Sequence, residues 1–177
     1  MLVLGIDPGT AVTGYGVVKA DHVGSMTLVE CGVIRTRARD ALPVRLQEIY
    51  EGIAELIRTH RPDALSVEDI FYAHNVRTTI VLGHARGVIL LAAQQAGIDI
   101  FEYPPAVIKK AVVGTGSATK TQVQFMLTRL LRLKSVPQPS DAADGVAAAL
   151  TYAMTARAPG SNGSTLPTPR LGKNTLR

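Results

Sequence analysis

The chain opens with three runs whose apolar residues alternate or follow one another as they do in β-strands. These runs are Leu2 to Asp7, Thr13 to Lys19 and Thr27 to Ile34. Pro8-Gly9 separates the first two, and a polar stretch over residues 21–25 separates the second from the third. Both are typical turn sequences, and connections this short join antiparallel strands. The pattern therefore predicts two consecutive hairpins.

Beyond residue 40 the apolar positions change to helical spacing, interrupted by two short apolar strands. Over residues 43–60 the apolar side chains recur every three or four positions, and charged residues fill the other face. This is the pattern of an amphipathic helix. Further helices are predicted over residues 77–95, 105–113, 119–133 and 141–156, and strands over 64–67 and 98–103. The order βββαβαβααα predicts an α/β fold with a mixed five-stranded sheet and helices on both faces.

The predicted helix over residues 77–95 is apolar around most of its circumference, so a single partner surface would not bury it. It contains His84, Arg86 and two glutamines, which argue against a membrane span. Small residues such as Gly83 and Gly87 would let another backbone approach closely, which suits a two-fold interface between two copies of the chain. A helix buried wholly within one monomer is the alternative.

Composition indicates one folded domain followed by a tail. The chain has 177 residues, of which 46% are hydrophobic and 19% charged, which is enough for one domain with a hydrophobic core. From residue 158 onward Pro, Gly, Ser, Asn and Thr dominate, and few large apolar residues remain to anchor the chain. We therefore expect a folded domain over residues 1–157 and a disordered basic tail over residues 158–177.

Nothing in the sequence indicates an oxidising compartment. Cys31 is the only cysteine, so an intrachain disulfide cannot form, and the four histidines lack the spacing of zinc ligands. The first ten residues lack the cationic start and the cleavage site of a signal peptide. The cytoplasm is the expected location.

The net charge of +5 is unevenly distributed along the chain. Residues 1–72 carry 7 Lys and Arg against 10 Asp and Glu, whereas residues 73–139 carry 8 against 2. A basic block of this kind suits a polyphosphate partner, because binding would release counterions condensed on a nucleic acid. A solvated basic surface is an equally good explanation of the charge alone.

Two acidic residues end predicted strands. Asp7 precedes the turn at Pro8-Gly9, and Glu68 follows the buried strand over residues 64–67. An Asp before Pro-Gly is common simply as a turn residue. However, the carboxyl ends of neighbouring parallel strands form the ligand crevice in open α/β sheets, so both acids could face one site.

Two further acids open the last predicted helix. Asp141 and Asp144 are spaced i, i+3 and therefore share one face of that helix. Acids in a first turn often serve only to compensate the helix dipole. The small neighbours Ala142, Ala143, Ala147 and Ala148 would nevertheless let the helix approach the sheet and bring its acids to the other two. Four carboxylates suit two Mg²⁺ or Mn²⁺ ions, which can clamp a phosphodiester during in-line attack.

Four short segments together resemble the RuvC family of Holliday-junction resolvases. They are Gly5-Ile6-Asp7-Pro8-Gly9-Thr10, Glu68-Asp69-Ile70-Phe71, Val112-Val113-Gly114-Thr115-Gly116-Ser117 with Lys120, and Asp141-Ala142-Ala143-Asp144. The resemblance runs over roughly residues 1–156. It implies a ribonuclease-H-like fold, a homodimer, dependence on divalent metal, and paired nicks placed symmetrically across a four-way junction. It also implies that the chain works with a branch-migration complex of RuvA and RuvB.

The resemblance assigns roles to individual residues. Asp7, Glu68, Asp141 and Asp144 match the catalytic, metal-binding acids of the family, and Lys109 and Lys120 match basic residues that hold DNA near the cut or assist the chemistry. Phe71 matches an aromatic side chain that inserts against bases at the junction. Lys110 and Arg77, from the same basic block, are further candidates for DNA contact. Asp69 is an extra acid, and strand alternation points it away from Glu68.

Other functions fit parts of the sequence less well. Residues 114–121 are one residue short of a phosphate-binding P-loop, which has glycine where Thr119 stands. The opening motif also resembles the first phosphate loop of actin-like ATPases and sugar kinases, but those proteins need two such domains. A small YqgF-type nuclease that processes ribosomal RNA, and a DNA-binding module without catalytic activity, remain the alternatives to a junction resolvase.

Overall fold

A computed structural model describes residues 1–69 and 76–156 of the chain. Five strands form one mixed sheet in the order β3-β2-β1-β4-β5. The strands are β1 (Leu2–Asp7), β2 (Val12–Ala20), β3 (Met26–Arg35), β4 (Ala64–Glu68) and β5 (Asp99–Tyr103). The pairs β1–β2 and β2–β3 are antiparallel, as the short turns predict, while β4 runs parallel to both β1 and β5. The mixed five-stranded sheet predicted from the sequence is confirmed.

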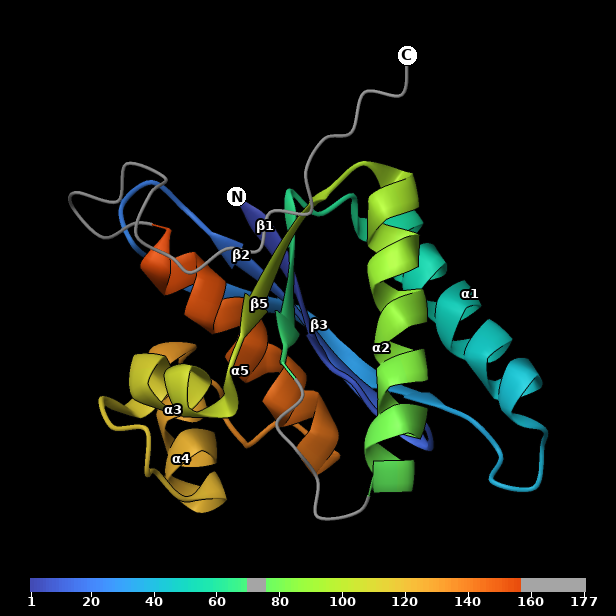
Figure 1. The fold of residues 1–177 in the computed structure, drawn as a ribbon. Helices are drawn as coiled ribbons and strands as arrows, with labels where there is room; N and C mark the ends of the chain where they lie inside the picture. Colours follow the sequence, from blue (N-terminus) through green and yellow to red (C-terminus); the bar gives the residue numbers. More distant parts are fainter. Residues whose placement is uncertain (70–75, 157–177) are drawn as a thin grey trace.

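Helices cover both faces of this sheet (Figure 1). The helices α1 (Leu42–His60) and α2 (Val76–Ala96) lie on one face. The helix α5 (Ser140–Thr155) crosses the other face, with α3 (Pro105–Val113) and α4 (Lys120–Leu130) packed beside it. Each sheet face therefore has its own hydrophobic core, and β1 contributes to both because its side chains alternate between the faces.

The predicted helix over residues 119–133 is shorter in the structure. α4 ends at Leu130, and the chain turns at Arg132, whose φ is 52°. The apolar residues Leu131 and Leu133 still pack against the core on the α5 side, but from a turn rather than from a helix. Leu131 follows Leu127 by four positions and Leu133 follows Leu130 by three, so the sequence pattern extended the helix beyond its end.

One face of α2 has no partner within the described part of the chain. Its buried residues are Ala85, Ile89, Ala92 and Ala93, all on the side toward α1 and the sheet. The helix is long and apolar enough to cross a membrane by length and composition, yet only 22% of that stretch is buried in the protein. The structure thus contradicts a helix buried wholly within one monomer. The predicted tail over residues 158–177 lies outside the described residues.

Candidate active site

The sheet brings Asp7 and Glu68 together at the ends of neighbouring strands. β1 and β4 are parallel, and Ile6 lies opposite Val67, so the acid that follows each residue lies at the same edge of the sheet. Alternation also selects the face. Ile6 and Val67 pack in the core beneath α1 and α2, which directs both carboxylates to the opposite face, where α5 lies.

The helix α5 reaches these strand ends because glycine and alanine form its contact with the sheet. Ala142, Ala143, Ala147 and Ala148 are buried, as the small-residue pattern predicts. The helix comes so close at Gly5 that an added Cβ would lie 2.2 Å from the backbone oxygen of Gly145. This packing carries Asp144 inward from the first turns of α5 to the edge where β1 and β4 end.

The acids line a cavity of about 320 Å³ between the sheet, α5 and the two smaller helices. Its charged lining consists of Asp7, Glu68 and Asp144 together with Lys109 from α3 and Lys120 from α4. Asp141 is not part of the lining, but its charge reaches the cavity and raises the pKa of Asp7. The structure therefore brings three of the four predicted acids to one cavity and places the fourth beside it.

Crowding and burial make these carboxyl groups hard to ionise. The pKa of Asp7 is raised to about 8, mainly by burial and then by the nearby negative charges, of which Glu68 contributes most. The pKa of Glu68 is raised to about 7 by burial and by Asp144. Without a cation, the cavity would therefore retain protons near neutral pH that separated carboxyl groups would have lost.

Lys120 partly offsets the negative charge of these carboxyl groups. Its Nζ lies 2.6 Å from Oδ2 of Asp144, and it stands at the first position of α4. That start is fixed by a capping box, in which the side chains of Thr119 and Gln122 each accept a hydrogen bond from the other's backbone N–H. The lysine is thus held at the cavity by the way its helix begins.

The donor set fits a divalent cation in charge and chemistry. Carboxylate oxygens are the ligands that Mg²⁺ and Mn²⁺ prefer, and burial of several of them favours a bound cation over ionised acids alone. In residues 1–69 and 76–156, however, no three acidic, histidine or cysteine side chains lie close enough to hold one ion together. Asp144 is engaged by Lys120, so a cation that used Asp144 would have to displace the ammonium group.

The predicted DNA contacts are only partly gathered at this cavity. Lys109 lines it, whereas the exposed Lys110 and Arg77 do not. Arg77 lies in the first turn of α2, immediately after residues 70–75. Phe71 falls outside the described residues, so its assignment to base insertion stays a prediction.

An ion-pair cluster beneath Glu68 was not foreseen from the sequence. The next residue, Asp69, points to the α2 side, as alternation predicts, where its Oδ1 lies 3.3 Å from Nη2 of Arg86. The same guanidinium group pairs with Glu102 on β5. The backbone N–H of Asp69 also donates to the carbonyl oxygen of Tyr103. These contacts fasten the chain just after Glu68 to both β5 and α2.

Replacing Arg86 with methionine should destabilise the protein by about 2 to 4 kcal/mol, because Glu102 would lose the partner of a largely buried charge. Adding Glu102→Gln to this variant should recover part of the loss. Urea unfolding of the wild type, both single variants and the double variant would measure this coupling. A double variant no more stable than Arg86→Met alone would contradict it.

Comparison with known proteins gives one consistent family. Residues 3–152 match the family model described as "Crossover junction endodeoxyribonuclease RuvC". Proteins of that name from Pelotomaculum thermopropionicum and Brevibacillus brevis are each 49% identical to this chain, over 86% and 87% of it and over 93% and 92% of their own lengths. The structure of Thermus thermophilus RuvC superposes with a TM-score of 0.82 at 35% identity, covering 89% of this chain and 96% of the other. A second structure shows that protein in complex with a Holliday junction substrate.

Proposed function

Because this chain belongs to the RuvC family of crossover junction endodeoxyribonucleases, we propose that it cuts DNA at the cavity where β1, β4 and α5 meet. The chain is a ribonuclease-H-like endonuclease that resolves Holliday junctions in DNA recombination and repair. The observation that carries the location of the site is the convergence of Asp7, Glu68 and Asp144 in one cavity together with two lysines.

Nucleases of this family depend on metal, and we infer two Mg²⁺ or Mn²⁺ ions per active site. Asp7, Glu68, Asp144 and Asp141 are the residues that would hold them. Bound there, the ions would activate water and stabilise charge on the scissile phosphate. The side chains themselves orient the substrate: strand ends fix Asp7 and Glu68, and the capped start of α4 fixes Lys120 where a phosphate oxygen could accept its hydrogen bond.

The remaining DNA contacts are assigned by position. Lys109 at the cavity would bind a phosphate close to the cut. Lys110 and Arg77, both exposed, would bind phosphates farther away. Phe71 would stack on a base at the centre of the junction, which requires unpaired or splayed bases and would distinguish a junction from a continuous duplex. Base stacking and phosphate contact together would give affinity and selectivity for structure.

Symmetric nicking needs two active sites, and the exposed face of α2 is the surface we assign to a homodimer. Val76, Ile80, Gly87 and Leu91 follow one another at helical spacing, and all four are exposed in the monomer. Among the residues that the structure describes, a Cβ added at Gly83 or Gly87 would meet no atom within 4 Å, so this stripe has room for a second backbone. An isologous pairing of two α2 helices would bury it.

Gly87→Glu should convert the dimer to a monomer at micromolar concentration, because it places a charge in this stripe without disturbing the monomer core. Ala96→Glu, at the opposite side of the same helix, is the matched control and should leave the dimer intact. Sedimentation velocity distinguishes the two states. A monomeric wild type, or equal effects of both variants, would exclude α2 as the interface.

Other assignments follow from the family. We propose that the chain acts in the cytoplasm and receives its junctions from a branch-migration complex of RuvA and RuvB. The tail over residues 158–177 is proposed to be dispensable for folding of the nuclease domain over residues 1–157.

The function is tested by supplying the full chain with Mg²⁺ or Mn²⁺ and a labelled four-way DNA junction, with the matched linear duplex and the corresponding RNA as competitors. We expect paired nicks in two opposed strands, and none in the presence of a chelator. Cleavage confined to RNA would favour the YqgF-type alternative. Tight junction binding without cleavage in either metal would favour a module without catalytic activity.

A further inference from the structure

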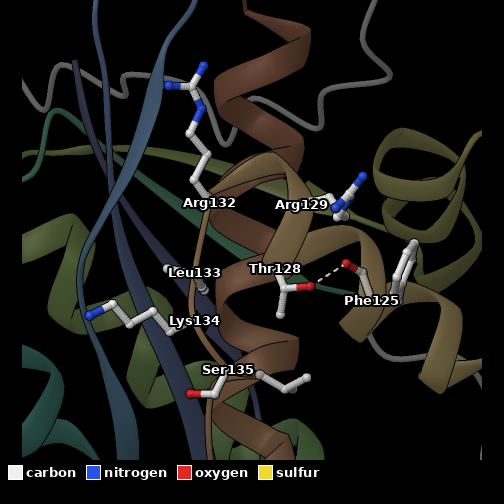
Figure 2. Close-up of a pocket in the computed structure, with 8 residues that line it drawn as sticks. Phe125, Thr128, Arg129, Arg132, Leu133, Lys134 and Ser135 are labelled. Carbon is white, nitrogen blue, oxygen red and sulfur yellow. Dashed lines mark hydrogen bonds between the residues drawn. The ribbon is translucent and has the colours of Figure 1, made fainter.

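A second hollow lies at the far end of α4 from the carboxylate cavity (Figure 2). We call it the α4 hollow. Its volume is about 590 Å³, which exceeds that of the carboxylate cavity. The residues that line it are Phe125, Thr128, Arg129, Arg132, Leu133, Lys134, Ser135 and Val136. None of them lines the carboxylate cavity.

Among the described residues, the lining of the α4 hollow carries three positive charges and no negative one. Arg129, Arg132 and Lys134 are all exposed, and in residues 1–69 and 76–156 none of the three forms an ion pair with a carboxylate. The C-terminus of α4 offers about half a negative charge, which would account for one cation at most. The concentration of positive charge therefore calls for an anionic partner.

The backbone after α4 directs the basic side chains of the hollow toward solvent. After α4 the residues alternate, with Leu131 and Leu133 packed against the core while Arg132 and Lys134 face solvent. Figure 2 shows Arg132 and Lys134 on one side of the hollow and Arg129 on the other, beside Phe125. Because the two leucines anchor the turn, the basic side chains project from a fixed frame and not from a free loop.

An aromatic ring completes the rim of the α4 hollow. Phe125 is 59% exposed, and the guanidinium carbon of Arg129 lies 6.0 Å from its ring centroid. That contact orients the arginine and leaves its outer donors free to bind an anion. Arginine and lysine side chains held at a surface are common donors to the phosphate oxygens of DNA.

The position of the α4 hollow relates it to the cut. Lys120, at the first position of α4, lines the carboxylate cavity, and the hollow begins at Phe125 and continues beyond the last residue, Leu130. Eleven helical residues span roughly 16 Å, which equals the rise of about five nucleotides along one DNA strand. A strand that left the active site along α4 would therefore carry its backbone over the hollow.

We propose that the α4 hollow binds the phosphate backbone of a junction arm about five nucleotides from the cleaved phosphate. The proposal rests on the proposed function and adds to it a second anchor on the substrate. This anchor fixes the direction in which an arm leaves the active site, so it contributes to recognition of the junction and takes no part in the chemistry. An acidic protein segment is the competing occupant.

The protein side of the contact is tested with the triple variant Arg129→Gln, Arg132→Gln, Lys134→Gln, which keeps side-chain length and removes three charges. Loss of three phosphate contacts should lower the log-log salt slope of junction binding by about 2.7 and weaken binding at least tenfold at ~0.1 M salt. The control is the triple variant Lys19→Gln, Arg37→Gln, Arg61→Gln, which removes three exposed charges elsewhere on the protein. Arg61 has a positive φ, as Arg132 does, so the two triple variants are matched in this respect. The control slope should stay near that of the wild type.

The DNA side is tested by neutral methylphosphonate linkages placed four to six nucleotides from the cut. They should weaken binding by the wild type and by the control variant, but should not weaken the α4-hollow variant any further. An equal effect of the linkages on all three proteins, or an unchanged salt slope in the α4-hollow variant, would overturn the proposal and leave an acidic protein as the candidate occupant. Should the triple variant unfold, the linkages still test the wild type, in which only positions near the fifth phosphate should matter.

These results are separable from the proposed function. Metal-dependent nicking of the junction by the wild type tests the nuclease assignment whatever happens at the α4 hollow. If the wild type nicks the junction and the triple variant binds it with an unchanged salt slope, only the role of the α4 hollow as a DNA anchor is excluded.

Discussion

Asp7→Asn should lower the rate of junction cleavage by at least a factor of about 1,000, equivalent to roughly 4 kcal/mol of transition-state stabilisation. Asparagine keeps the shape of the side chain but removes the negative charge that we propose holds a cation beside Glu68 and Asp144. Junction affinity should stay within a few-fold of the wild type, because the substitution also removes a repulsive charge near the phosphates. Single-turnover cleavage with saturating metal, together with a binding titration, measures both effects.

The same substitution should stabilise the metal-free protein at neutral and higher pH. The pKa of Asp7 is raised to about 8 in the folded state, so between pH ~4 and ~8 the folded chain retains a proton that the unfolded chain has released. Wild-type stability must therefore fall as the pH rises through this window. At one pKa unit per 1.36 kcal/mol, and after a discount for relaxation of the site, the gain for asparagine at pH 8 should be about 2 to 4 kcal/mol.

Thermal melts in chelator from pH 5 to pH 8 test this sign. Asp99→Asn removes an exposed carboxylate at the start of β5 and is the control, expected to change neither cleavage nor the pH dependence of stability. Adding Mg²⁺ should reduce the stability difference between Asp7→Asn and the wild type, because only the wild type has the Asp7 carboxylate that would bind the ion. An Asp7→Asn variant that cuts at the wild-type rate would remove this residue from the site.

Gly5→Ala should destabilise the fold by at least about 4 kcal/mol and leave most of the chain unfolded at 37 °C. The added Cβ would lie 2.2 Å from two backbone atoms of α5, the nitrogen of Ala149 and the oxygen of Gly145. Overpacking a core usually costs about 1 to 3 kcal/mol because side chains can shift, but here only movement of the whole helix could make room.

The matched control for Gly5→Ala is Gly52→Ala in α1. There the three atoms nearest the new Cβ all belong to the side chain of Ile34, which can move, and alanine gains up to ~1 kcal/mol of helix propensity. The control should therefore change stability by no more than about 1 kcal/mol. Circular dichroism and urea unfolding would compare the two variants. Similar small effects at both positions would mean that α5 is not seated on the sheet as described.

The strands and helices were largely predictable because each buries one clear face. Asp7 and Glu68 could be placed at one edge of the sheet because each ends a predicted strand, and the alanines of α5 correctly indicated a close approach to the sheet. The end of α4 could not be read in the same way, since Leu131 and Leu133 continue the apolar period through a turn.

Long-range pairings were beyond a reading of local pattern. Arg86, Glu102 and Asp69 lie on separate elements, and no spacing in the sequence joins them. The glycine contact between β1 and α5 left a weak trace, since Gly5 interrupts a buried strand and Gly145 a helix. Glycine inside a strand is a known mark of close backbone approach, so this signal could have been used.

The backbone contact between β1 and α5 also determines how the enzyme loses activity on heating. The helix that carries Asp141 and Asp144, two of the proposed metal ligands, is also the centre of one hydrophobic core, so it cannot loosen without exposing its buried alanines. We therefore expect no intermediate in which the chain stays folded while the acids of α5 have moved away from Asp7 and Glu68. Heat inactivation and global melting should coincide on one curve, and homologous enzymes adapted to other temperatures would have to shift that curve as a whole instead of softening the active site alone.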